Sequence, residues 1–234
     1  MESENILEAK QVSVAFRIAG KFQKAIYDID LRLRRGEVLA IVGESGSGKS
    51  TFATAVMGLH NPNQTQITGS ILLDDEEVIG KTGDSMASIR GSKVGMIFQN
   101  PDNQLVTDKV WHELAFGLES LGVDNQSIRR RVAEMASFFD MQTWFRKSVS
   151  ELSGGQKQLL NLASVMVMQP KVLVLDEPTS QLDPIAAEEF LNTVYKINRE
   201  LGTTVIISEH RLEDLIPMAD RVVVMDKGEI ISAA

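Results

Sequence analysis

Two kinds of apolar pattern run along the chain and predict two kinds of strand. Ile29, Leu31 and Leu33 alternate with charged residues, which predicts a strand with one face in solvent. We expect residues 70–73 to form its partner strand. Elsewhere the aliphatic residues are continuous, as in central strands that helices cover on both faces. These continuous runs are residues 38–42, 172–175 and 205–207.

Segments with helical periodicity lie between the strands. The clearest are residues 49–59, 126–139, 155–168 and 184–201. The last of these begins with Pro184, a residue that the first turn of a helix accepts. Residues 221–226 add a further strand. This order of elements predicts an α/β protein with an antiparallel β flank and a helix-rich insert around residues 100–160.

Composition narrows the class of protein. The 234 residues correspond to one large domain or two small ones, and 43% apolar with 24% charged residues exclude a disordered chain. The formal net charge of −8 argues against a domain that mainly neutralises nucleic-acid phosphates. The chain has no cysteine, which excludes disulfides and cysteine-ligated zinc and fits a reducing compartment. The acidic start lacks a secretory signal, and no apolar run reaches the roughly 20 residues of a membrane-spanning helix, so we expect a soluble protein that works at a membrane only from outside the bilayer.

A glycine-rich segment follows the buried strand at residues 38–42 and precedes a helix. It matches the phosphate-loop pattern G-x-x-x-x-G-K-S and consists of Gly43, Glu44, Ser45, Gly46, Ser47, Gly48, Lys49, Ser50 and Thr51. In this context the backbone N–H groups and the helix N-terminus bind the phosphates of a nucleotide. Lys49 adds a charge between the β- and γ-phosphates, and the Ser50 hydroxyl ligates Mg²⁺. A flexible Gly/Ser turn is the alternative, and the flanking strand and helix argue against it.

Two adjacent carboxylates, Asp176 and Glu177, end the buried strand that begins at residue 172. They fall at the carboxyl edge of the sheet, where α/β proteins bind ligands. Neighbouring strand positions point apart, so we expect the two carboxylates to have different roles. Asp176 is placed to hold the Mg²⁺ shell, and Glu177 to polarise a water aimed at the γ-phosphorus. An acidic strand end that leads into the Pro178 turn is the structural alternative.

The segment from Leu152 to Gln156 combines a helix start with two glycines. Ser153 and Gln156 have the S-x-x-Q spacing of a capping box, which predicts a helix N-terminus. A cap does not require Gly154 and Gly155, so these glycines indicate close approach of the backbone to a ligand, with N–H groups and a hydroxyl offered to an anion. Since the phosphate loop already binds one nucleotide, this second anion site would face the nucleotide of another molecule.

The phosphate loop, residues 152–156 and the run at residues 175–183 together resemble the ATP-binding subunit of an ABC (ATP-binding cassette) transporter, over essentially the whole chain. The resemblance implies the ABC ATPase fold, a P-loop NTPase with a RecA-like core, an antiparallel β flank and a helical insert. It implies a nucleotide-binding core of residues 1–99 and 161–234 and a helical subdomain of residues 100–160. It also implies ATP and Mg²⁺ as cofactors, with ATP sandwiched between two cassettes.

The resemblance implies further site residues. Gln99 resembles the glutamine that senses Mg²⁺ and the attacking water, and Asp183 the aspartate that reaches across the dimer. His210 resembles the histidine that contacts the γ-phosphate. An idle surface histidine is the alternative for His210, and its place just after a buried strand favours the functional role. Phe16 is the nearest match to the aromatic residue that stacks on adenine, with Phe22 as a rival.

The resemblance is not uniform along the chain. Residues 84–101 look most like di- and oligopeptide importer ATPases, whereas residues 102–106, 110–119 and 207–214 look like energy-coupling-factor ATPases. Both classes usually extend beyond the position of Ala234. We therefore expect an engineered or recombinant composite, a chimera joined near residues 100–102, with a shortened C-terminus.

The resemblance also implies a groove between the core and the helical insert, which receives the membrane subunit. Residues 102–121 would form one wall of this groove and so bear on the choice of membrane partner. If this wall sets recognition, the chain pairs with an energy-coupling-factor membrane subunit and not with a peptide permease. Trp111, Leu114, Phe116 and Leu118 suit such a docking groove. Trp111, Leu114 and Leu118 at helical spacing are equally suited to a core stripe.

The favoured interpretation is a Mg²⁺-ATP-hydrolysing subunit of an ABC importer, peripheral on the inner, cytoplasmic face of the cell membrane. Its partners would be an integral membrane subunit and a second ABC ATPase, in a homodimer or heterodimer, with no nucleic acid. A non-transport ABC ATPase of DNA repair, chromosome structure or translation is one alternative, but residues 100–150 lack the heptads of its coiled coil. The other is a composite cassette that binds nucleotide without productive turnover. The transported substrate, whether vitamin, metal ion or peptide, stays open.

Overall fold

A computed structural model of the chain describes residues 4–210 and 212–233. Arg211 and Ala234, which belong to segments discussed above, lie outside the described residues.

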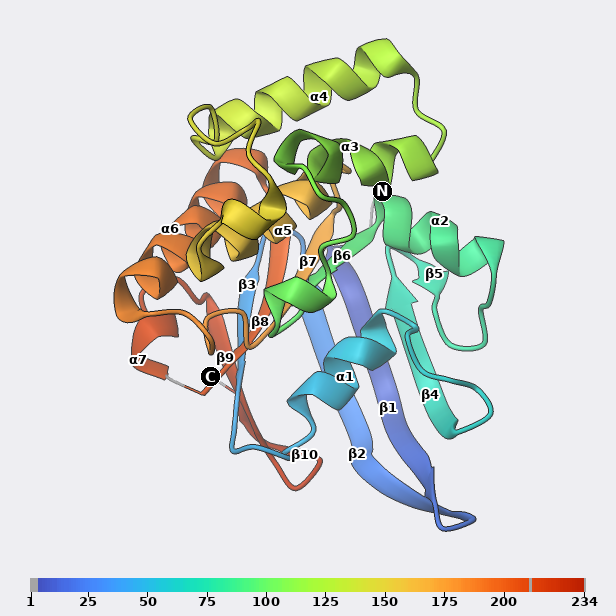
Figure 1. Cartoon of the computed structure of the whole chain (residues 1–234). Helices are drawn as coiled ribbons and strands as arrows, with labels where there is room; N and C mark the ends of the chain where they lie inside the picture. Colours follow the sequence, from blue (N-terminus) through green and yellow to red (C-terminus); the bar gives the residue numbers. More distant parts are fainter. Residues whose placement is uncertain (1–3, 211, 234) are drawn as a thin grey trace.

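A six-stranded sheet forms the centre of the molecule, in the order β10-β9-β3-β8-β7-β6 (Figure 1). All neighbours from β9 to β6 are parallel, and β10 pairs antiparallel at the edge. The strands are β3 Val38–Val42, β6 Val94–Ile97, β7 Val172–Asp176, β8 Thr204–Glu209, β9 Arg221–Asp226 and β10 Glu229–Ala233. Every residue of β3, β7 and β8 is buried, which confirms that the three aliphatic runs are central strands.

A four-stranded antiparallel sheet flanks the central one, in the order β2-β1-β4-β5. Its strands are β1 Asn5–Ile18, β2 Lys21–Arg34, β4 Thr65–Leu73 and β5 Glu76–Glu77. Ile29, Leu31 and Leu33 of β2 are buried as the alternation predicts. The expected pairing of β2 with residues 70–73 is wrong, because β1 lies between β2 and β4 and pairs with both. A tight turn with positive φ at Ala19 and Gly20 joins β1 directly to β2, so these two strands form a hairpin.

Helices cover both faces of the central sheet and form the predicted insert. They are α1 Lys49–Val56, α2 Asp84–Ser92, α3 Val110–Ser120, α4 Asn125–Phe138, α5 Gly154–Met166, α6 Pro184–Leu201 and α7 Leu212–Leu215, with short 3₁₀ turns η1 Pro101–Asn103 and η2 Val149–Glu151. The α6 helix has the predicted bounds, and the other predicted helices shift by a few residues at their ends. Helix α1 ends before the predicted residue 59, because Gly58 adopts a left-handed φ of 58°.

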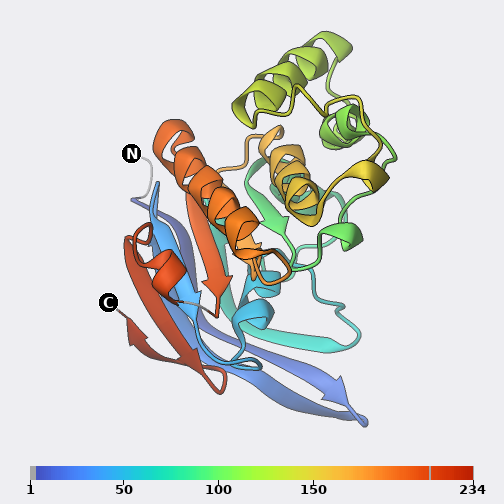
Figure 2. The ribbon, with the colours of Figure 1, turned by 60° about the vertical axis from the view of Figure 1, so that its left-hand side comes forward.

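Two hydrophobic cores lie on opposite faces of the central sheet. Val38, Ala40 and Val42 of β3 pack into the core with α3 to α6, whereas Leu39 and Ile41 pack into the core with α1, α2 and the antiparallel sheet. Figure 2 shows α3, α4 and α5 gathered at the end of the molecule opposite the antiparallel strands. Helix α5 continues through residue 160, so the expected boundary between core and helical subdomain falls inside a helix.

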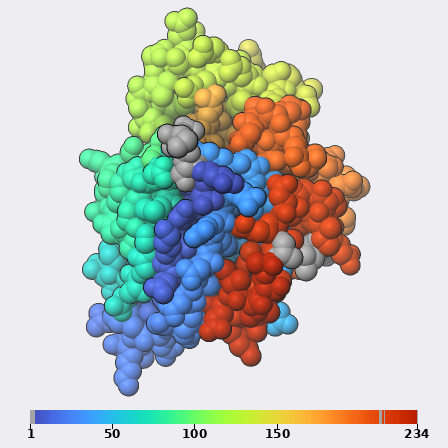
Figure 3. All heavy atoms as spheres, turned by 180° about the vertical axis from the view of Figure 1, so that it is seen from behind, coloured from blue at the N-terminus to red at the C-terminus, as the bar shows by residue number. Residues whose placement is uncertain are grey.

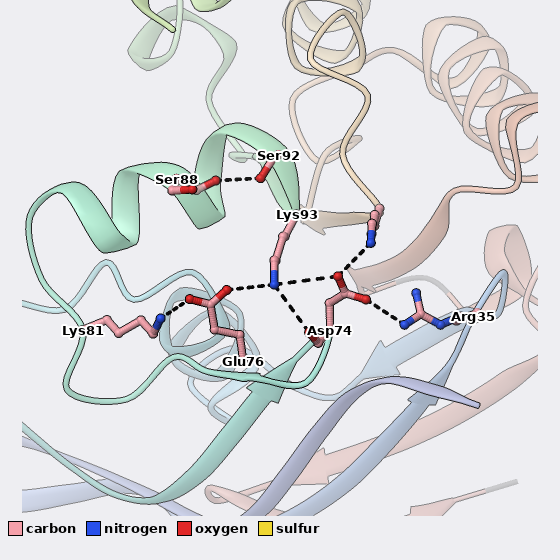
Figure 4. A network of polar contacts seen from close by, with 8 residues as sticks. Arg35, Asp74, Glu76, Lys81, Ser88, Ser92 and Lys93 are labelled. Carbon is pink, nitrogen blue, oxygen red and sulfur yellow. Dashed lines mark hydrogen bonds and ion pairs between the residues drawn. The ribbon is translucent and has the colours of Figure 1, made fainter. Parts of the chain in front are cut away.

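An ionic network fastens the antiparallel sheet to the central sheet (Figure 4). Asp74, in the turn after β4, lies 2.7 Å from the guanidinium of Arg35, 2.7 Å from Lys171 Nζ and 3.7 Å from Lys93 Nζ. Lys93 also lies 2.8 Å from the Glu76 carboxylate. Hydrogen bonds from Lys171 and Arg35 lower the pKa of Asp74 to about 2. Since Lys171 and Lys93 directly precede β7 and β6, the network holds the turn against the amino ends of two central strands.

Candidate active site

The phosphate loop joins β3 to α1 and packs tightly against its surroundings. A Cβ on Gly43 would overlap the backbone of β9 and lie 2.8 Å from Ser47 Oγ. At Gly48, where φ is +105°, a Cβ would lie 2.6 Å from the side chain of Ile26. The N–H of Gly228, in the β9–β10 turn, donates to Ser47 O at 2.9 Å. Close packing therefore requires glycine at positions 43 and 48, and later strands hold the loop in shape.

Lys49 is the first residue of α1, and its ammonium folds back over the loop. Nζ donates to Gly43 O at 2.7 Å and to Glu44 O at 3.0 Å, and it lies 3.7 Å from Glu177 Oε1. Only 3% of the side chain is exposed. The loop thus holds one ammonium between carbonyl oxygens and a carboxylate, where it can turn toward the oxygens of a phosphate.

A cavity of about 430 Å³ opens beside Lys49. It brings together the phosphate loop, Gln99 and the end of β7. Its lining residues are Lys24, Ala25, Tyr27, Ser45, Gly46, Gly48, Lys49, Ser50, Thr51, Gln99, Glu177 and Lys227. The predicted residues that line it come from three separate parts of the sequence, at the carboxyl edge where α/β sheets bind ligands.

The two carboxylates at the end of β7 have different partners, as the strand geometry predicts. Asp176 Oδ1 accepts a hydrogen bond from Ser50 Oγ at 2.9 Å and another from Ser208 Oγ at 2.8 Å. Glu177 turns away with a left-handed φ of 48°. Its Oε1 lies 2.9 Å from His210 Nε2, so Glu177 stands between the ring of His210 and the ammonium of Lys49.

The chemistry of these groups fits a nucleotide with a hard divalent cation. Ser50 contributes a hydroxyl, Asp176 a carboxylate and Gln99 an amide oxygen, and oxygen ligands of this kind suit Mg²⁺. Within residues 4–210 and 212–233 no group of three His, Cys, Asp or Glu residues could hold a metal by itself. The remaining ligands of a cation here would have to come from the nucleotide phosphates and water.

Ser208 and Glu209, at the end of β8, are site residues that the sequence analysis missed. Ser208 bridges to Asp176, and Glu209 Oε1 accepts from the N–H and hydroxyl of Thr179 at 3.0 and 2.7 Å. Burial raises the pKa of Glu209. Their position in the sequence could have identified these two residues, because they are the first polar side chains after the aliphatic run at residues 205–207.

The start of α5 has the predicted cap. Ser153 Oγ accepts from Gln156 N–H at 3.2 Å, and Gln156 Oε1 accepts from Ser153 N–H at 3.0 Å, which confirms the capping box. A Cβ on Gly155 would lie 2.9 Å from Ala186 Cβ, so this glycine permits close approach to α6 of the same chain, whereas Gly154 faces open space.

The residues expected to act between two molecules lie apart from the cavity. Asp183 caps α6 by accepting from the N–H groups of Ile185 and Ala186 at 3.1 and 3.0 Å. Neither Asp183 nor residues 153–156 belong to the lining of the 430 Å³ cavity. The structure therefore brings together the phosphate loop and the Glu177 side of the site, but not these two groups.

The predicted adenine-stacking residue also lies outside the cavity lining. Phe16 is half-buried and its ring meets the edge of His60, with 5.6 Å between ring centroids. Phe22, the rival, is 50% exposed near the β1–β2 turn. Lys24, Tyr27 and Lys227 line the cavity instead, and sequence reasoning missed all three. Both Lys24 and Tyr27 belong to β2, which contacts β10, and in the rear view the surface of this part of the chain lies beside that of the C-terminal residues (Figure 3).

Comparisons with known proteins agree on a family. The family model described as ABC transporter matches residues 26–180. The oligopeptide transport ATP-binding protein OppD of Lactococcus lactis subsp. lactis is 55% identical, over all of this chain and 71% of that protein. The structure of cbiO1 from Clostridium perfringens, part of a cbiONQ complex, is 33% identical with a TM-score of 0.87, over 99% of this chain and 89% of that one. A dimeric ATP-binding cassette in a post-hydrolysis state, bound to ADP and Pi, is 24% identical with a TM-score of 0.84, over 97% of both chains, and shows the shared fold.

The expected junction near residues 100–102 gains no support from these matches. The similarity to OppD runs through that position over the whole chain. A buried hydrogen bond also links this segment to α5, since Asn161 Nδ2 donates to Pro101 O at 3.0 Å. Among the described residues, no helix is both long and apolar enough to cross a bilayer.

Proposed function

This chain is an ATPase of the ABC transporter family, and from that premise we propose that it is the ATP-hydrolysing subunit of an oligopeptide importer. The observation that carries the catalytic part is the Glu177 carboxylate, which lies between Lys49 and His210 beside the phosphate-loop cavity. The substrate class rests on 55% identity to a protein named for oligopeptide transport.

The roles of the residues follow from their positions. Glu177 accepts the proton of a water whose oxygen attacks the γ-phosphorus, and the bond to ADP breaks as phosphate forms. His210, 2.9 Å from Glu177 Oε1, orients that carboxylate. Lys49 and the loop N–H groups stabilise the charge on the transferred phosphoryl group. Ser50, Asp176 and Gln99 would hold Mg²⁺, which supplies further charge neutralisation when bound.

The second part of the proposal is a sandwich of two cassettes. The N-terminus of α5 is exposed at Ser153 and Gly154, and a helix start with free N–H groups attracts anions. Its own chain supplies no phosphate there, because the phosphate loop lies at a different cavity. ATP on one chain would therefore be covered by residues 153–156 of a second chain, identical or homologous, with Asp183 near the contact.

The third part is a membrane partner. Leu114 and Leu118 are fully buried and belong to the core, whereas Trp111 and Phe116 of the same helix are 45% and 39% exposed. The core-stripe interpretation is therefore confirmed for Leu114 and Leu118 and is wrong for Trp111, and the docking proposal is limited to Trp111 and Phe116. We assign the exposed side chains to a surface that receives an integral membrane subunit, which would place the protein on the inner, cytoplasmic face of the cell membrane.

The catalytic assignment is tested with Glu177→Gln. Removing the proton acceptor while Lys49 and Ser50 stay in place should lower ATP turnover about 10²- to 10⁴-fold, the range for a general base, and leave nucleotide binding intact. Glu200→Gln, on an exposed position at the end of α6, serves as the control. Turnover near that of the unmodified chain would refute the role of Glu177.

The sandwich is tested with the same variant. Light scattering of Glu177→Gln should show a doubling of mass when Mg²⁺-ATP is added, because hydrolysis no longer separates the chains. A mass that does not change with ATP would count against the sandwich.

The partner is tested by co-expression with a peptide permease and, separately, with an energy-coupling-factor membrane subunit, followed by pull-down. The identity to OppD predicts capture of the peptide permease. Capture of the energy-coupling-factor subunit alone would overturn the peptide assignment and support the groove wall at residues 102–121 as the determinant.

A further inference from the structure

One buried side-chain amide touches both backbone segments that carry Glu177 and Gln99. Gln158 lies on α5, between α3 and α6 (Figure 1), and its side chain is fully buried. Its Nε2 donates to Pro178 O at 2.8 Å and to Phe98 O at 3.3 Å. Pro178 directly follows Glu177, and Phe98 directly precedes Gln99.

The orientation of this amide is set by a second buried amide on the same helix. Asn161 is also fully buried, and its Nδ2 lies 3.5 Å from Gln158 Oε1 and donates to Pro101 O at 3.0 Å. With its oxygen turned toward Asn161, Gln158 directs both N–H groups at the carbonyls of Pro178 and Phe98. Residues three apart on a helix lie on the same face, so α5 presents the pair as one unit.

The backbone of Glu177 requires such support. Its φ of 48° is a left-handed conformation that side chains other than glycine rarely adopt, and residues of this kind persist only where their surroundings fix them. Before the turn, Glu177 N–H donates to Ser208 O at 3.0 Å. After the turn, the Pro178 carbonyl is held by Gln158. Within the turn, Ser180 Oγ donates to Glu177 O at 3.0 Å. Among the bonds that fix the turn, Gln158 supplies the one that comes from α5.

We propose that Gln158 is a positioning residue that fixes Glu177 and Gln99 relative to each other from inside α5. Its side chain is fully buried and does not line the cavity, so it acts through the Pro178 and Phe98 carbonyls. The inference deepens the proposed function, because it rests on Glu177 as the proton acceptor.

The test is Gln158→Met, which keeps a side chain of similar length and removes both N–H donors. A displacement of catalytic groups by about 1 Å can lower turnover 10²-fold, so we expect kcat to fall about 10- to 100-fold. The KM for ATP should change by less than about twofold, because Lys49 and the phosphate loop are untouched.

A matched control is available in the same chain. Asn198 on α6 is 4% exposed, and its Nδ2 donates to Gly36 O at 2.8 Å and to Thr203 O at 2.9 Å, away from the site. Asn198→Leu likewise leaves two carbonyls without their donor. Both variants should lose thermal stability, but only Gln158→Met should lose kcat.

The outcomes distinguish failure of the positioning role of Gln158 from failure of the proposed function. Equal loss of kcat in both variants, or a raised KM with unchanged kcat in Gln158→Met, would overturn the positioning role. If Gln158→Met does not fold, Gln158→Asn, whose side chain is one methylene shorter and draws the donor back from both carbonyls, is measured by the same criteria. Glu177→Gln is assayed alongside: its inactivity beside a fully active Gln158→Met refutes this inference alone, whereas its full activity refutes the proposed function.

Discussion

Replacing Asp74 with Asn should weaken the attachment of the antiparallel sheet to the central sheet. The pKa of Asp74 falls from 3.8 to about 2, through hydrogen bonds from Lys171 and Arg35. At about 1.4 kcal/mol per pKa unit this corresponds to roughly 2–3 kcal/mol of folding free energy before screening by solvent. Solvent reaches 15% of the side chain and screens the ion pairs, so we expect a loss of about 1–2 kcal/mol at pH 7.

The effect should depend on pH in a defined direction. Because the pKa is lower in the folded chain, the ionised carboxylate stabilises the fold above the unfolded value of 3.8. That contribution is lost as pH falls from 3.8 through about 2, where the folded chain also takes up the proton. The stability difference between the two proteins should therefore be constant near neutral pH and shrink in acid.

Urea unfolding followed by circular dichroism, repeated from pH 7 to acid, measures this difference. Asp75→Asn is the matched control, since Asp75 occupies the same turn with a φ of 60°, is exposed and belongs to no ion pair described for residues 4–210 and 212–233. Asn tolerates left-handed φ, so neither variant should strain the turn. Equal losses in both variants, or a loss for Asp74→Asn that persists unchanged in acid, would show that the ion pairs of Asp74 do not cause the difference in stability.

Three further predictions concern the site. Lys49→Ala should weaken ATP binding itself by about 10- to 100-fold, as expected for a charged hydrogen-bond donor, and calorimetric titration with an unchanged Kd would contradict this. Ser153→Arg should abolish the ATP-dependent dimer of Glu177→Gln in light scattering, while Ser153→Ala, which loses the cap but adds no bulk, still dimerises. Gly48→Ala should cost about 2–3 kcal/mol in urea unfolding, because its Cβ meets Ile26, whereas Gly46→Ala, in open space, should cost only about 1–2; equal costs would exclude packing as the cause.

Much of the fold could be predicted because its elements have strong local patterns. The continuous aliphatic runs have no solvent-facing side, so β3, β7 and β8 had to be central strands. The partner of β2 was missed because alternation identifies which face is buried but not which strand lies alongside. The turn at Ala19 and Gly20 was the local signal that pairs β2 with β1.

The candidate site likewise contains residues that the sequence predicts and residues that it does not. Contiguous motifs such as the phosphate loop and the Ser153 cap could be found because one stretch of chain contains the whole geometry. Lys24, Tyr27 and Lys227 could not, because they reach the cavity only when β2 and the β9–β10 turn come together. Ser208 and Gln158 were missed for a related reason. They act through hydrogen bonds to residues that are distant in the sequence, and no short motif contains both partners of such a bond.

The phosphate loop is completed by parts of the chain that the ribosome adds much later. Strand β3 lies between β8 and β9, and Gly228 donates to Ser47 O in the loop itself. A nascent chain that ends after α6 has the whole glycine-rich segment but neither neighbour of β3, so the aliphatic strand stays unpaired and open to chaperones or aggregation. The loop therefore reaches its complete form only after β8 and the β9–β10 turn have been made, and ATP can act as a folding ligand only from that point of synthesis.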